Sequence, residues 1–271
     1  MTSLTNPQSK IRFETMTLAY HERVAVLTLS RPNAMNAMNA RFFDDFQEAL
    51  ADISSDNRHM GALLITAEGS GFCAGADLKD QSGEMPPHLG DKLRQSYNPL
   101  IKNLKELPIP TVVAINGAAA GAGMSLVCAC DIAIASKQAY FLQAFINIAL
   151  IPDAGSTYFL PRLVGRSRAA ALMMLGEKLP AEKALEFGLI SQVVDHDELL
   201  KTGLQLAEKL STMPTEALFS IRKLLDQSEI NTLDQQLEAE ATAQQIAGQS
   251  PDFMEGVMAF IQKRKPKFNL T

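Results

Sequence analysis

The chain has 271 residues, of which 46% are hydrophobic and 20% charged, a balance typical of a globular protein with a sizeable core. Its formal net charge of -5 argues against a general nucleic-acid binder, and its three cysteines do not suggest a disulfide framework. No apolar run is long enough to span a bilayer, and the polar start MTSLTNPQSK lacks the layout of a signal peptide. We therefore expect a cytoplasmic protein with no membrane partner.

The first half of the chain alternates between strand and helix patterns. Residues 24–29 form a short β-branched run, which is followed by phenylalanines and leucines at helical spacing. Residues 63–66 are the next predicted strand, and residues 92–107 predict an amphipathic helix that must stop before Pro108. Strands separated by helices predict an α/β fold with largely parallel strands.

A strand, a small-residue turn and a helix are predicted in the middle of the chain. Residues 111–116 are apolar and β-rich, and Gly117, Gly121 and Gly123 follow, separated by alanines. Such a turn lets a ligand approach the backbone, and the first helical turn leaves N–H groups without intrahelical acceptors. A phosphate or a developing oxyanion would suit these donors. The glycine pattern fits neither a P-loop nor a dinucleotide fingerprint, which favours the oxyanion.

A second small-residue turn, residues 70–78, follows the predicted strand at 63–66. Two strand-to-turn segments that each offer a backbone N–H could converge on one oxygen as an oxyanion hole. The alternative is two tight turns with no site, and the pattern alone does not separate these interpretations. Residues 81–90, which contain two prolines and two glycines, could be a mobile cover over such a site or an ordinary surface loop.

After Asp153 the pattern is helical almost to the end, with Val193 and Val194 as the last strand remnant. This change predicts an α/β core over residues 1–195 and a helical part over 196–271. One helical face after Pro214 carries more apolar surface than a terminal appendage should expose, which predicts self-association. The residues of that face are Leu218, Ile221, Leu224 and Leu225.

The last predicted helix has Ser250 as its N-cap and Pro251 at its first position, and it ends in a basic stretch at residues 263–267. Cys128 and Cys130 lie two apart with no histidine near them, so we interpret them as small core residues rather than as metal ligands.

Several motifs in register resemble the crotonase, or enoyl-CoA hydratase/isomerase, superfamily. They are RP with NA at 31–37, GFCAGADL at 71–78, AINGAAAGAG at 114–123, DIAIA at 131–135, IPDAG at 151–155 and AFIQKRK at 259–265. The resemblance implies a spiral of repeated β-β-α units with a helical C-terminal trimerisation region. It therefore implies a homotrimer or a dimer of trimers.

The resemblance also implies an acyl-CoA substrate, whose thioester oxygen would accept hydrogen bonds from the N–H groups of Ala76 and Ala122. Lys79, Phe260 and Lys263 would contact coenzyme A, the last two across a subunit interface. Coenzyme A arrives with the substrate, so no separate cofactor and no metal are expected. The remaining residues expected to line the site are Ala34, Ala74, Gly75, Gly121, Ser125 and Phe145.

Hydratases of this family hold water between two glutamates, and the matching positions here are Ser125 and Phe145. Neither is acidic, which puts ordinary hydration in doubt. One acid remains, Asp153, at the offset of the working aspartate in dienoyl-CoA isomerases, a 4-chlorobenzoyl-CoA dehalogenase and the ring-epoxide isomerases of phenylacetyl-CoA breakdown. The segment looks most like the last of these, and the dehalogenase's tryptophan and partner histidine have no counterpart.

Two roles for Asp153 follow. The residues alone favour an N-cap for a helix beginning near Ala154, whereas the resemblance favours catalysis. Apolar residues flank it in sequence, and such surroundings would raise the pKa of its carboxyl group and keep the pocket dry. These residues are Phe145, Ile146, Ile148, Leu150, Ile151 and Phe159.

We therefore expect an acyl-CoA isomerase in which Asp153 removes a proton and returns it elsewhere, shifting a double bond or reorganising a ring epoxide. The first alternative is a hydratase that uses Asp153 with bound water. The second, from another class, is a protein that binds acyl-CoA, or RNA through the basic residues 263–267, without turnover. Coenzyme A phosphates would explain these charges equally well, so we predict no nucleic-acid partner.

Overall fold

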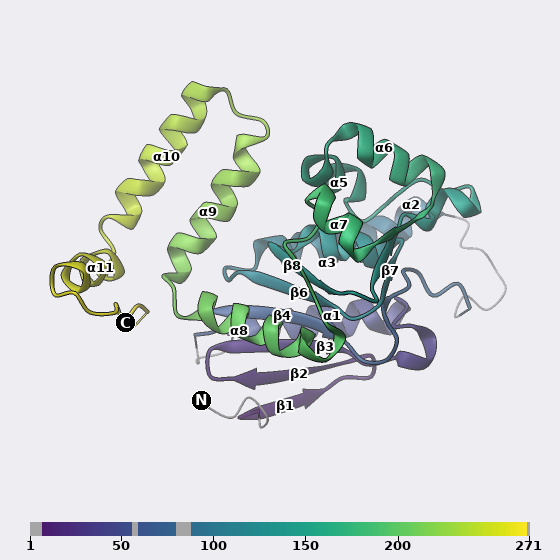
Figure 1. The fold of residues 1–271 in the computed structure, drawn as a ribbon, viewed down its shortest axis with the longest axis horizontal. Coiled ribbons are helices and arrows are strands. Elements are labelled where there is room, and N and C mark those ends of the chain that lie inside the picture. The colour runs from purple at the N-terminus through teal and green to yellow at the C-terminus, as the bar shows by residue number, and fades with distance from the viewer. Residues whose placement is uncertain (1–6, 56–58, 80–87, 270–271) are drawn as a thin grey trace.

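The computed structural model describes residues 7–55, 59–79 and 88–269. Most of the loop predicted at 81–90 lies outside these residues. The strands form two sheets (Figure 1). The larger sheet has the order β1-β2-β3-β4-β6-β8-β11. Its strands are β1 (Ser9–Arg12), β2 (Met16–His21), β3 (Val24–Leu29), β4 (Ala62–Ala67), β6 (Thr111–Ile115), β8 (Ile132–Ser136) and β11 (Gln192–Val194).

The smaller sheet has the order β10-β9-β7-β5. Its strands are β5 (Gly71–Cys73), β7 (Ala118–Ala120), β9 (Tyr140–Leu142) and β10 (Lys178–Pro180). In the larger sheet β3, β4, β6, β8 and β11 run parallel, and in the smaller one β5, β7 and β9 do. Each of β4, β6 and β8 leads into the next strand of the smaller sheet. The chain therefore climbs as a spiral of β-β-α turns, as the family resemblance implied.

Helices cover both faces of the larger sheet and surround the smaller one. They are α1 (Ala40–Ser55), α2 (Leu89–Lys92), α3 (Asn98–Glu106), α4 (Ala122–Ala129), α5 (Ser156–Val164), α6 (Arg166–Leu175), α7 (Ala181–Phe187) and α8 (Leu199–Ser211). Short 3-10 turns lie at Pro32–Ala34, Ala144–Ile148 and His196–Glu198. All eight residues of α4 are buried, so the helix after the glycine turn lies at the centre of the molecule.

The strands of the larger sheet alternate between two apolar clusters. In β3, Ala25, Leu27 and Leu29 belong to the main core, whereas Val24 and Val26 face the opposite cluster. Both faces are therefore covered, which explains why the central parallel strands read as nearly continuous apolar runs. Residues of α8, including Leu199, Leu204 and Ala207, complete the second cluster. The division into residues 1–195 and 196–271 stays a prediction, but α8, which falls in its second part, packs on the sheet.

The helix predicted over 92–107 is present and carries a π-helical turn, Leu93–Tyr97, between α2 and α3. There the N–H of Asn98 donates to the carbonyl oxygen of Leu93, five residues back. The next residue is Pro99, which has no N–H to continue an α-helical ladder. Turns of this kind inside helices are frequent at functional sites.

The last three helices are α9 (Thr215–Ser228), α10 (Leu233–Ala247) and α11 (Pro251–Ile261), and they extend away from the spiral (Figure 1). The predicted cap of the last helix is confirmed, because the Ser250 hydroxyl oxygen accepts a hydrogen bond from the Phe253 N–H at 3.1 Å. Thr232 and Gln235 form a capping box at the start of α10. These helices therefore have well-formed ends although they contribute little to the core.

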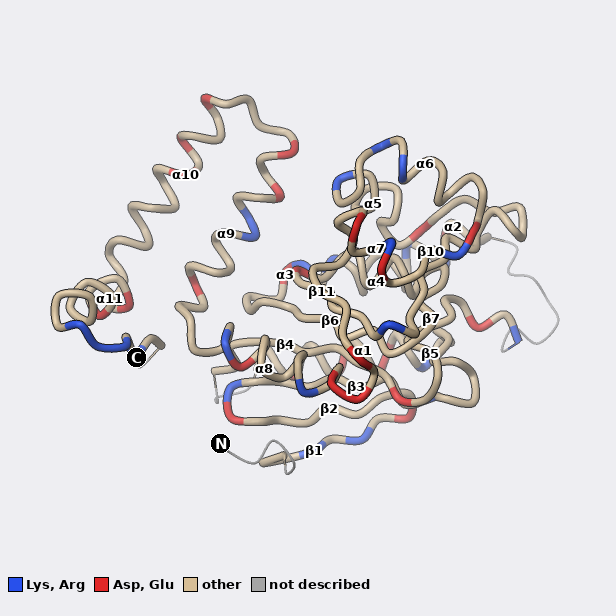
Figure 2. The backbone as a smooth tube through the Cα atoms, viewed as in Figure 1, with Lys and Arg blue, Asp and Glu red and all other residues tan. Residues whose placement is uncertain are grey.

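The basic stretch follows α11 at the end of the chain, as Figure 2 shows. Part of its charge is neutralised within the chain, because Arg264 donates to both oxygens of Glu255, at 2.5 and 2.7 Å. The hydrogen bonds from Arg264, and one from the Lys267 N–H, lower the pKa of Glu255 to about 2. No helix in the described part of the chain has the length and apolar character needed to cross a membrane.

Candidate functional site

The two small-residue turns singled out from the sequence lie against each other. Gly75 has a φ of +88°, and a Cβ there would lie 2.8 Å from the Ala120 carbonyl oxygen and 3.2 Å from the Ala122 nitrogen. A Cβ on Gly123 would lie 2.3 Å from the carbonyl oxygen of Cys73. Real Cβ atoms do not approach this closely, so side chains at these positions would force the turns apart. The glycines therefore allow the backbones of the turns to meet.

In each turn, one backbone N–H donates no hydrogen bond to the described part of the chain. Ala76 forms an isolated parallel bridge with Met38. The hydrogen bonds of this bridge are made by the two neighbours of Ala76. The Met38 N–H donates to the Gly75 carbonyl oxygen at 2.7 Å, and the Asp77 N–H donates to the Met38 carbonyl oxygen at 3.1 Å. The N–H of Ala76 itself consequently points away from Met38. Ala122 is the first residue of α4, so its N–H has no intrahelical acceptor. Across the described ranges, no acceptor is found for either N–H group.

The RP…NA motif braces the first turn at both ends. The Asn36 side-chain amide donates to the carbonyl oxygen of Gly71 at 2.9 Å, at the beginning of the turn. The Arg31 guanidinium forms an ion pair of 3.0 Å with the partly buried Asp77, at its end. Arg31 and Asn36 are themselves joined, because the Arg31 N–H donates to the Asn36 side-chain oxygen at 2.8 Å. The sequence marked this motif without giving it a role, and the structure shows that it shapes the turn.

The expected binding residues in and beside the first turn differ in exposure, and Gly75 is buried. Ala74 and Lys79 are exposed, and Ala34 and Ala76 are half-buried. The N–H of Ala74 donates to the carbonyl oxygen of Met35 at 3.0 Å, which ties it to the same brace. Gly121 in the second turn is buried, and its N–H donates to the Leu142 carbonyl oxygen at 2.8 Å. Their place in a binding site stays a prediction.

Asp153 is not a helix cap. The helix after it, α5, begins at Ser156, and its N-cap is Gly155, which makes no side-chain cap hydrogen bond. Ala154 and Gly155 both have positive φ angles, of 49° and 79°, so a left-handed turn separates Asp153 from the helix. The alternative favoured by the residues alone, a capping aspartate, is therefore wrong. The sequence places Asp153 directly before Ala154, but it does not show that a left-handed turn follows.

The side chain of Asp153 is half-buried, and its Oδ1 atom is shielded from solvent. Its Oδ1 atom has no hydrogen-bond partner among residues 7–55, 59–79 and 88–269. Burial raises its pKa to about 6, because the charged form loses hydration that nothing replaces. A carboxyl group with this pKa is ionised at neutral pH and can still accept a proton readily.

The enclosure predicted around Asp153 is only partly present in one chain. Phe145 is buried, but Ile146, Ile148 and Ile151 are 45%, 53% and 82% exposed. The expectation that these isoleucines line a dry pocket is therefore wrong for the single chain. They lie in and after the short 3-10 turn Ala144–Ile148, which exposes one side to solvent.

Ser125 lies between the second turn and Asp153. Its side chain is fully buried, and its hydroxyl group donates to the Asp153 carbonyl oxygen at 3.0 Å. This leaves Ser125 no surface to offer a substrate, although we expected it in the binding site. Phe145 lies on the other side, with its ring atom Cζ 3.8 Å from where a Cβ on Gly121 would be. An apolar ring therefore lies beside the second turn.

Tyr97 is a buried tyrosine that sequence reasoning did not connect with Asp153. It ends the π-helical turn, is 4% exposed and packs edge-on against Phe43, with 4.6 Å between ring centroids. Burial raises the pKa of its phenol, and the negative charge of Asp153 raises it further. Tyr97 is thus a buried hydroxyl group within electrostatic range of the carboxylate. In the sequence it is one aromatic residue in an amphipathic pattern, so only the π-helical turn distinguishes it.

Two of the expected coenzyme A contacts lie elsewhere. Phe260 is 86% exposed on α11, Lys263 follows it, and α11 lies at the opposite end of the molecule from α5 (Figure 1). A contact with the acyl group's site would need another copy of the chain, which stays a prediction.

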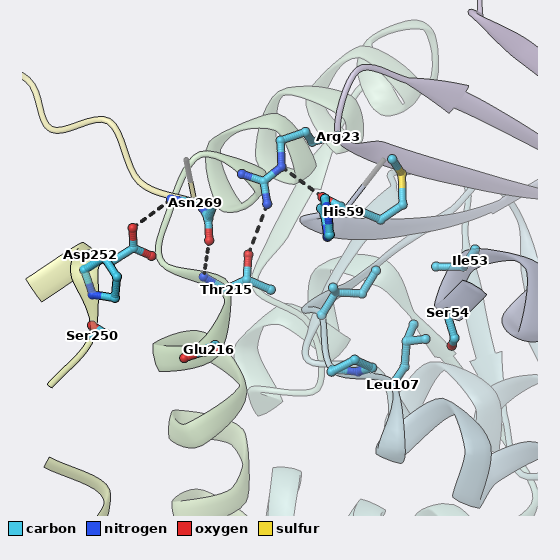
Figure 3. Close-up of a pocket in the computed structure, with 14 residues that line it drawn as sticks. Arg23, Ile53, Ser54, His59, Leu107, Thr215, Glu216, Ser250, Asp252 and Asn269 are labelled. Carbon is cyan, nitrogen blue, oxygen red and sulfur yellow. Dashed lines mark hydrogen bonds between the residues drawn. The ribbon is translucent and has the colours of Figure 1, made fainter. Parts of the chain in front are cut away.

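A separate cavity of about 340 Å³ lies where the sheet meets the last helices (Figure 3). Arg23 spans it, donating to the His59 carbonyl oxygen at 3.0 Å and to the Thr215 hydroxyl oxygen at 3.4 Å. The N–H of Asn269 donates to Asp252 at 2.7 Å. None of the predicted site residues lines this cavity, so it belongs to the attachment of the C-terminal helices.

Comparisons with known proteins identify the family of the chain. The family described as Enoyl-CoA hydratase/isomerase matches residues 19–270. A 1,2-epoxyphenylacetyl-CoA isomerase of Escherichia coli (strain K12) is 45% identical over 90% of this chain and 94% of its own. A trans-2-decenoyl-[acyl-carrier-protein] isomerase of Streptococcus mutans is 35% identical, with 90% and 94% covered.

A solved enoyl-CoA hydratase of Bacillus anthracis superimposes with a TM-score of 0.89 at 29% identity, covering 94% of this chain and 99% of that one. The matches extend over nearly the full length of the chain and of its relatives. The chain therefore belongs to the enoyl-CoA hydratase/isomerase family.

Proposed function

We propose that the protein is an acyl-CoA isomerase that polarises the thioester carbonyl between two backbone N–H groups and moves a proton with one carboxylate. The donors are the N–H groups of Ala76 and Ala122, and the proton carrier is Asp153. The observation that carries the proposal is the half-buried Asp153 carboxyl group, whose buried Oδ1 has no partner among the described residues and which is held one hydrogen bond away from the helix that begins at Ala122. A carboxylate oxygen that is buried without a partner is costly, and carboxyl groups with pKa values raised in this way cluster at functional sites.

The chemistry follows from these two features. Loss of a proton from the acyl chain places negative charge on the thioester oxygen, where the two N–H groups stabilise it. Each such donor typically lowers the barrier by about 3 kcal/mol. Asp153, ionised at neutral pH with a pKa of about 6, takes the proton and returns it to a different atom. Coenzyme A enters with the substrate, so the scheme needs no further cofactor.

The two positions used by hydratase glutamates support isomerisation. The Ser125 hydroxyl group is directed to a carbonyl oxygen at 3.0 Å, and Phe145 presents an aromatic ring. Of these three positions, Asp153 alone carries a carboxylate, and a single carboxylate cannot hold and split water as a pair does. The two relatives named as isomerases are named for 1,2-epoxyphenylacetyl-CoA and for trans-2-decenoyl-[acyl-carrier-protein]. We propose a ring epoxide or an enoyl chain as the acyl group.

Hydration of a 2-enoyl-CoA is the second candidate, favoured by the close superposition on the solved Bacillus anthracis hydratase. In that case Asp153 would activate water rather than carry a proton along the acyl group. Binding of RNA without turnover is disfavoured, because Glu255 already pairs with Arg264 in the basic stretch.

Turnover of a panel of 2-enoyl, 3-enoyl and ring-epoxide acyl-CoA compounds tests the proposal. We expect isomerisation of the best substrate to exceed hydration of crotonyl-CoA by orders of magnitude. Comparable rates would contradict the isomerase assignment.

The same assay with Asp153→Asn tests the role of the carboxyl group. We expect kcat to fall by about two to four orders of magnitude, the usual scale for a positioned base, with acyl-CoA affinity little changed. The matched control is Asp195→Asn, since Asp195 forms an exposed surface pair with Lys137. A variant Asp153→Asn that keeps more than about a tenth of the wild-type kcat, far above that scale, would place the base elsewhere.

A further inference from the structure

We propose that Ser125 is a positioning residue, which sets the place of the Asp153 carboxylate relative to the two N–H donors through a buried ring of hydrogen bonds. The inference rests on the proposed function, because it concerns how the proposed base is held. It assigns a role to a position where the family's hydratases carry a glutamate and this chain carries a hydroxyl group.

One half of the ring runs through α4. The N-cap of α4 is Gly121, whose N–H donates to the carbonyl oxygen of Leu142 at the end of β9, at 2.8 Å. One helical turn later, the N–H of Ser125 donates to the Gly121 carbonyl oxygen at 3.1 Å. The Ser125 hydroxyl group then reaches the Asp153 carbonyl oxygen at 3.0 Å, with the Gly121 carbonyl oxygen as a longer alternative at 3.3 Å. The second donor turn and Asp153 are thus joined through one side chain.

The other half returns from Asp153 to β9. The Asp153 carbonyl oxygen also accepts the N–H of Ser156 at 3.0 Å. The Ser156 hydroxyl oxygen accepts a hydrogen bond from the side-chain amide of Gln143 at 2.7 Å, and Gln143 follows Leu142 in the chain. The ring is therefore closed. Ser125, Ser156 and Gln143 are 0%, 0% and 1% exposed, so the three side chains of the ring are shielded from water.

The ring matters because nothing comparable holds the carboxylate itself. The Oδ1 atom of Asp153 has no partner in the described part of the chain, so the place of the side chain follows from that of its backbone. The backbone beyond it is a left-handed turn at Ala154 and Gly155, not a helix or a strand. The Asp153 carbonyl oxygen is held by two donors, and Ser125 is the one that comes from α4. Without that donor the carboxylate loses its fixed relation to Ala122.

The variant Ser125→Ala tests the inference, with kcat and KM measured on the best substrate. We expect kcat to fall about ten- to a hundredfold, the scale of a displacement of up to about 1 Å in a reacting group, with KM little changed. The matched control is Ser211→Ala, since Ser211 is 5% exposed and its hydroxyl group donates to the Glu208 carbonyl oxygen at 2.9 Å. The control loses the same kind of buried hydrogen bond and should keep its kcat.

A double variant distinguishes positioning from a general loss of structure. If Ser125 acts through Asp153, Ser125→Ala lowers kcat in the wild type but not in the Asp153→Asn background. An equal loss in both backgrounds, or a kcat for Ser125→Ala equal to that of the Ser211→Ala control, would overturn the inference and leave the proposed function intact. Full activity of Asp153→Asn alone would instead overturn the proposed function.

Gln143→Leu provides a second route if Ser125→Ala does not fold. It removes the donor to Ser156 on the other half of the ring while keeping a side chain of similar size. We expect a smaller fall in kcat, about three- to tenfold on the same positional scale, which again disappears in the Asp153→Asn background. An unchanged kcat for Gln143→Leu would overturn the ring as the positioning device.

Discussion

The spiral and the last three helices differ in how much of their side-chain surface is buried. Residues of the central strands are buried on both faces of the sheet, whereas α9, α10 and α11 together bury only Arg222 and Ala259. Large apolar side chains on these helices remain exposed, such as Leu225 at 65% and Leu233 at 74%. Apolar surface of this extent is typical of an interface. The spiral thus carries Ala76, Ala122 and Asp153, whereas the last helices need other contacts to be stable.

Those contacts are polar and centre on Arg222. Its guanidinium donates to both carboxylate oxygens of Asp131, at 2.7 and 2.5 Å, and to the carbonyl oxygens of Leu107 and Ile109, both at 2.6 Å. Asp131 lies between α4 and β8, so this side chain joins α9 to the spiral. Forked, charge-assisted hydrogen bonds of this kind are strong and demand a fixed geometry.

The largest effect that we expect comes from breaking this joint. Arg222→Met removes the ion-pair partner of Asp131, which keeps only its hydrogen bonds from Thr111, and the donor to two carbonyl oxygens, which should lower the free energy of unfolding by about 3–5 kcal/mol. Urea unfolding measures the change. We also expect faster proteolysis near Met213, where α9 would detach first. The control is Lys223→Met on the exposed side of the same helix, and equal losses for the two variants would contradict the special role of Arg222.

In the spiral, Gly75→Ala tests the contact between the two donor turns. A Cβ at Gly75 would lie 2.8 Å from the Ala120 carbonyl oxygen, so the turns must separate and the donors no longer converge. We expect kcat to fall by about 10²–10³-fold, the cost of losing one such donor, with oligomeric state unchanged. Gly165→Ala is a matched control, because Gly165 has a similar φ of +80° but no atom within 4 Å of the added Cβ.

Gly165→Ala carries the backbone strain without the collision. If it reduces kcat as much as Gly75→Ala, strain alone explains both losses and the contact between the turns is not required. Equal activity of Gly75→Ala and the wild type would contradict the proposed pair of donors.

A smaller and more local change tests whether the last helices meet another copy of the chain. Leu225→Glu places a charge on the apolar face of α9. If the predicted homotrimer or dimer of trimers buries this position, the change loses the burial of one leucine, about 1.5–3 kcal/mol for each site, and weakens assembly. Light scattering at micromolar concentration measures the mass. A wild type that is monomeric there would contradict the prediction.

Leu200→Glu is the control for that experiment, because Leu200 is 49% exposed on α8, which packs on the sheet. An assembly weakened by Leu200→Glu but not by Leu225→Glu would place the interface on the spiral instead of on the last helices.

The sequence predicted what local pattern determines. Alternating strands and helices, the two small-residue turns and the cap at Ser250 all depend on neighbouring residues, and each is present. Contacts between distant segments were not predictable in the same way. Nothing in the sequence pairs Ser125 with Asp153, 28 positions apart, or Arg222 with Asp131, 91 positions apart.

The same reasoning explains the two errors at Asp153. We predicted from its neighbours that Asp153 caps the next helix. The left-handed turn at Ala154 and Gly155 instead separates it from that helix, which begins at Ser156. The isoleucines around it share its neighbourhood in sequence, but the 3-10 turn directs them outward. The direction in which a side chain points relative to a site depends on such turns. Many sequences can adopt them, so the turns are hard to predict from the sequence.

The smallest effect that we expect is the pH-dependent loss of stability caused by the partly buried Asp153 carboxylate. Burial raises the pKa of Asp153 from 3.8 to about 6, so the folded protein favours the protonated carboxyl group. The stability that this group contributes is fully present below about pH 4 and is lost as the pH rises through about 6. Asparagine does not ionise and avoids this loss. Asp153→Asn should therefore be more stable than the wild type at pH 8, by about 1–2 kcal/mol after allowing for partial exposure, with the difference shrinking towards pH 5.

Urea unfolding at pH 5 and pH 8 measures this difference in stability, with the exposed Asp195→Asn as a control that should show no such trend. A constant difference between pH 5 and pH 8 would mean that the carboxylate is not desolvated. A capping aspartate would behave in the opposite way, because its ionised form would stabilise the helix and the variant would lose stability as the pH rises.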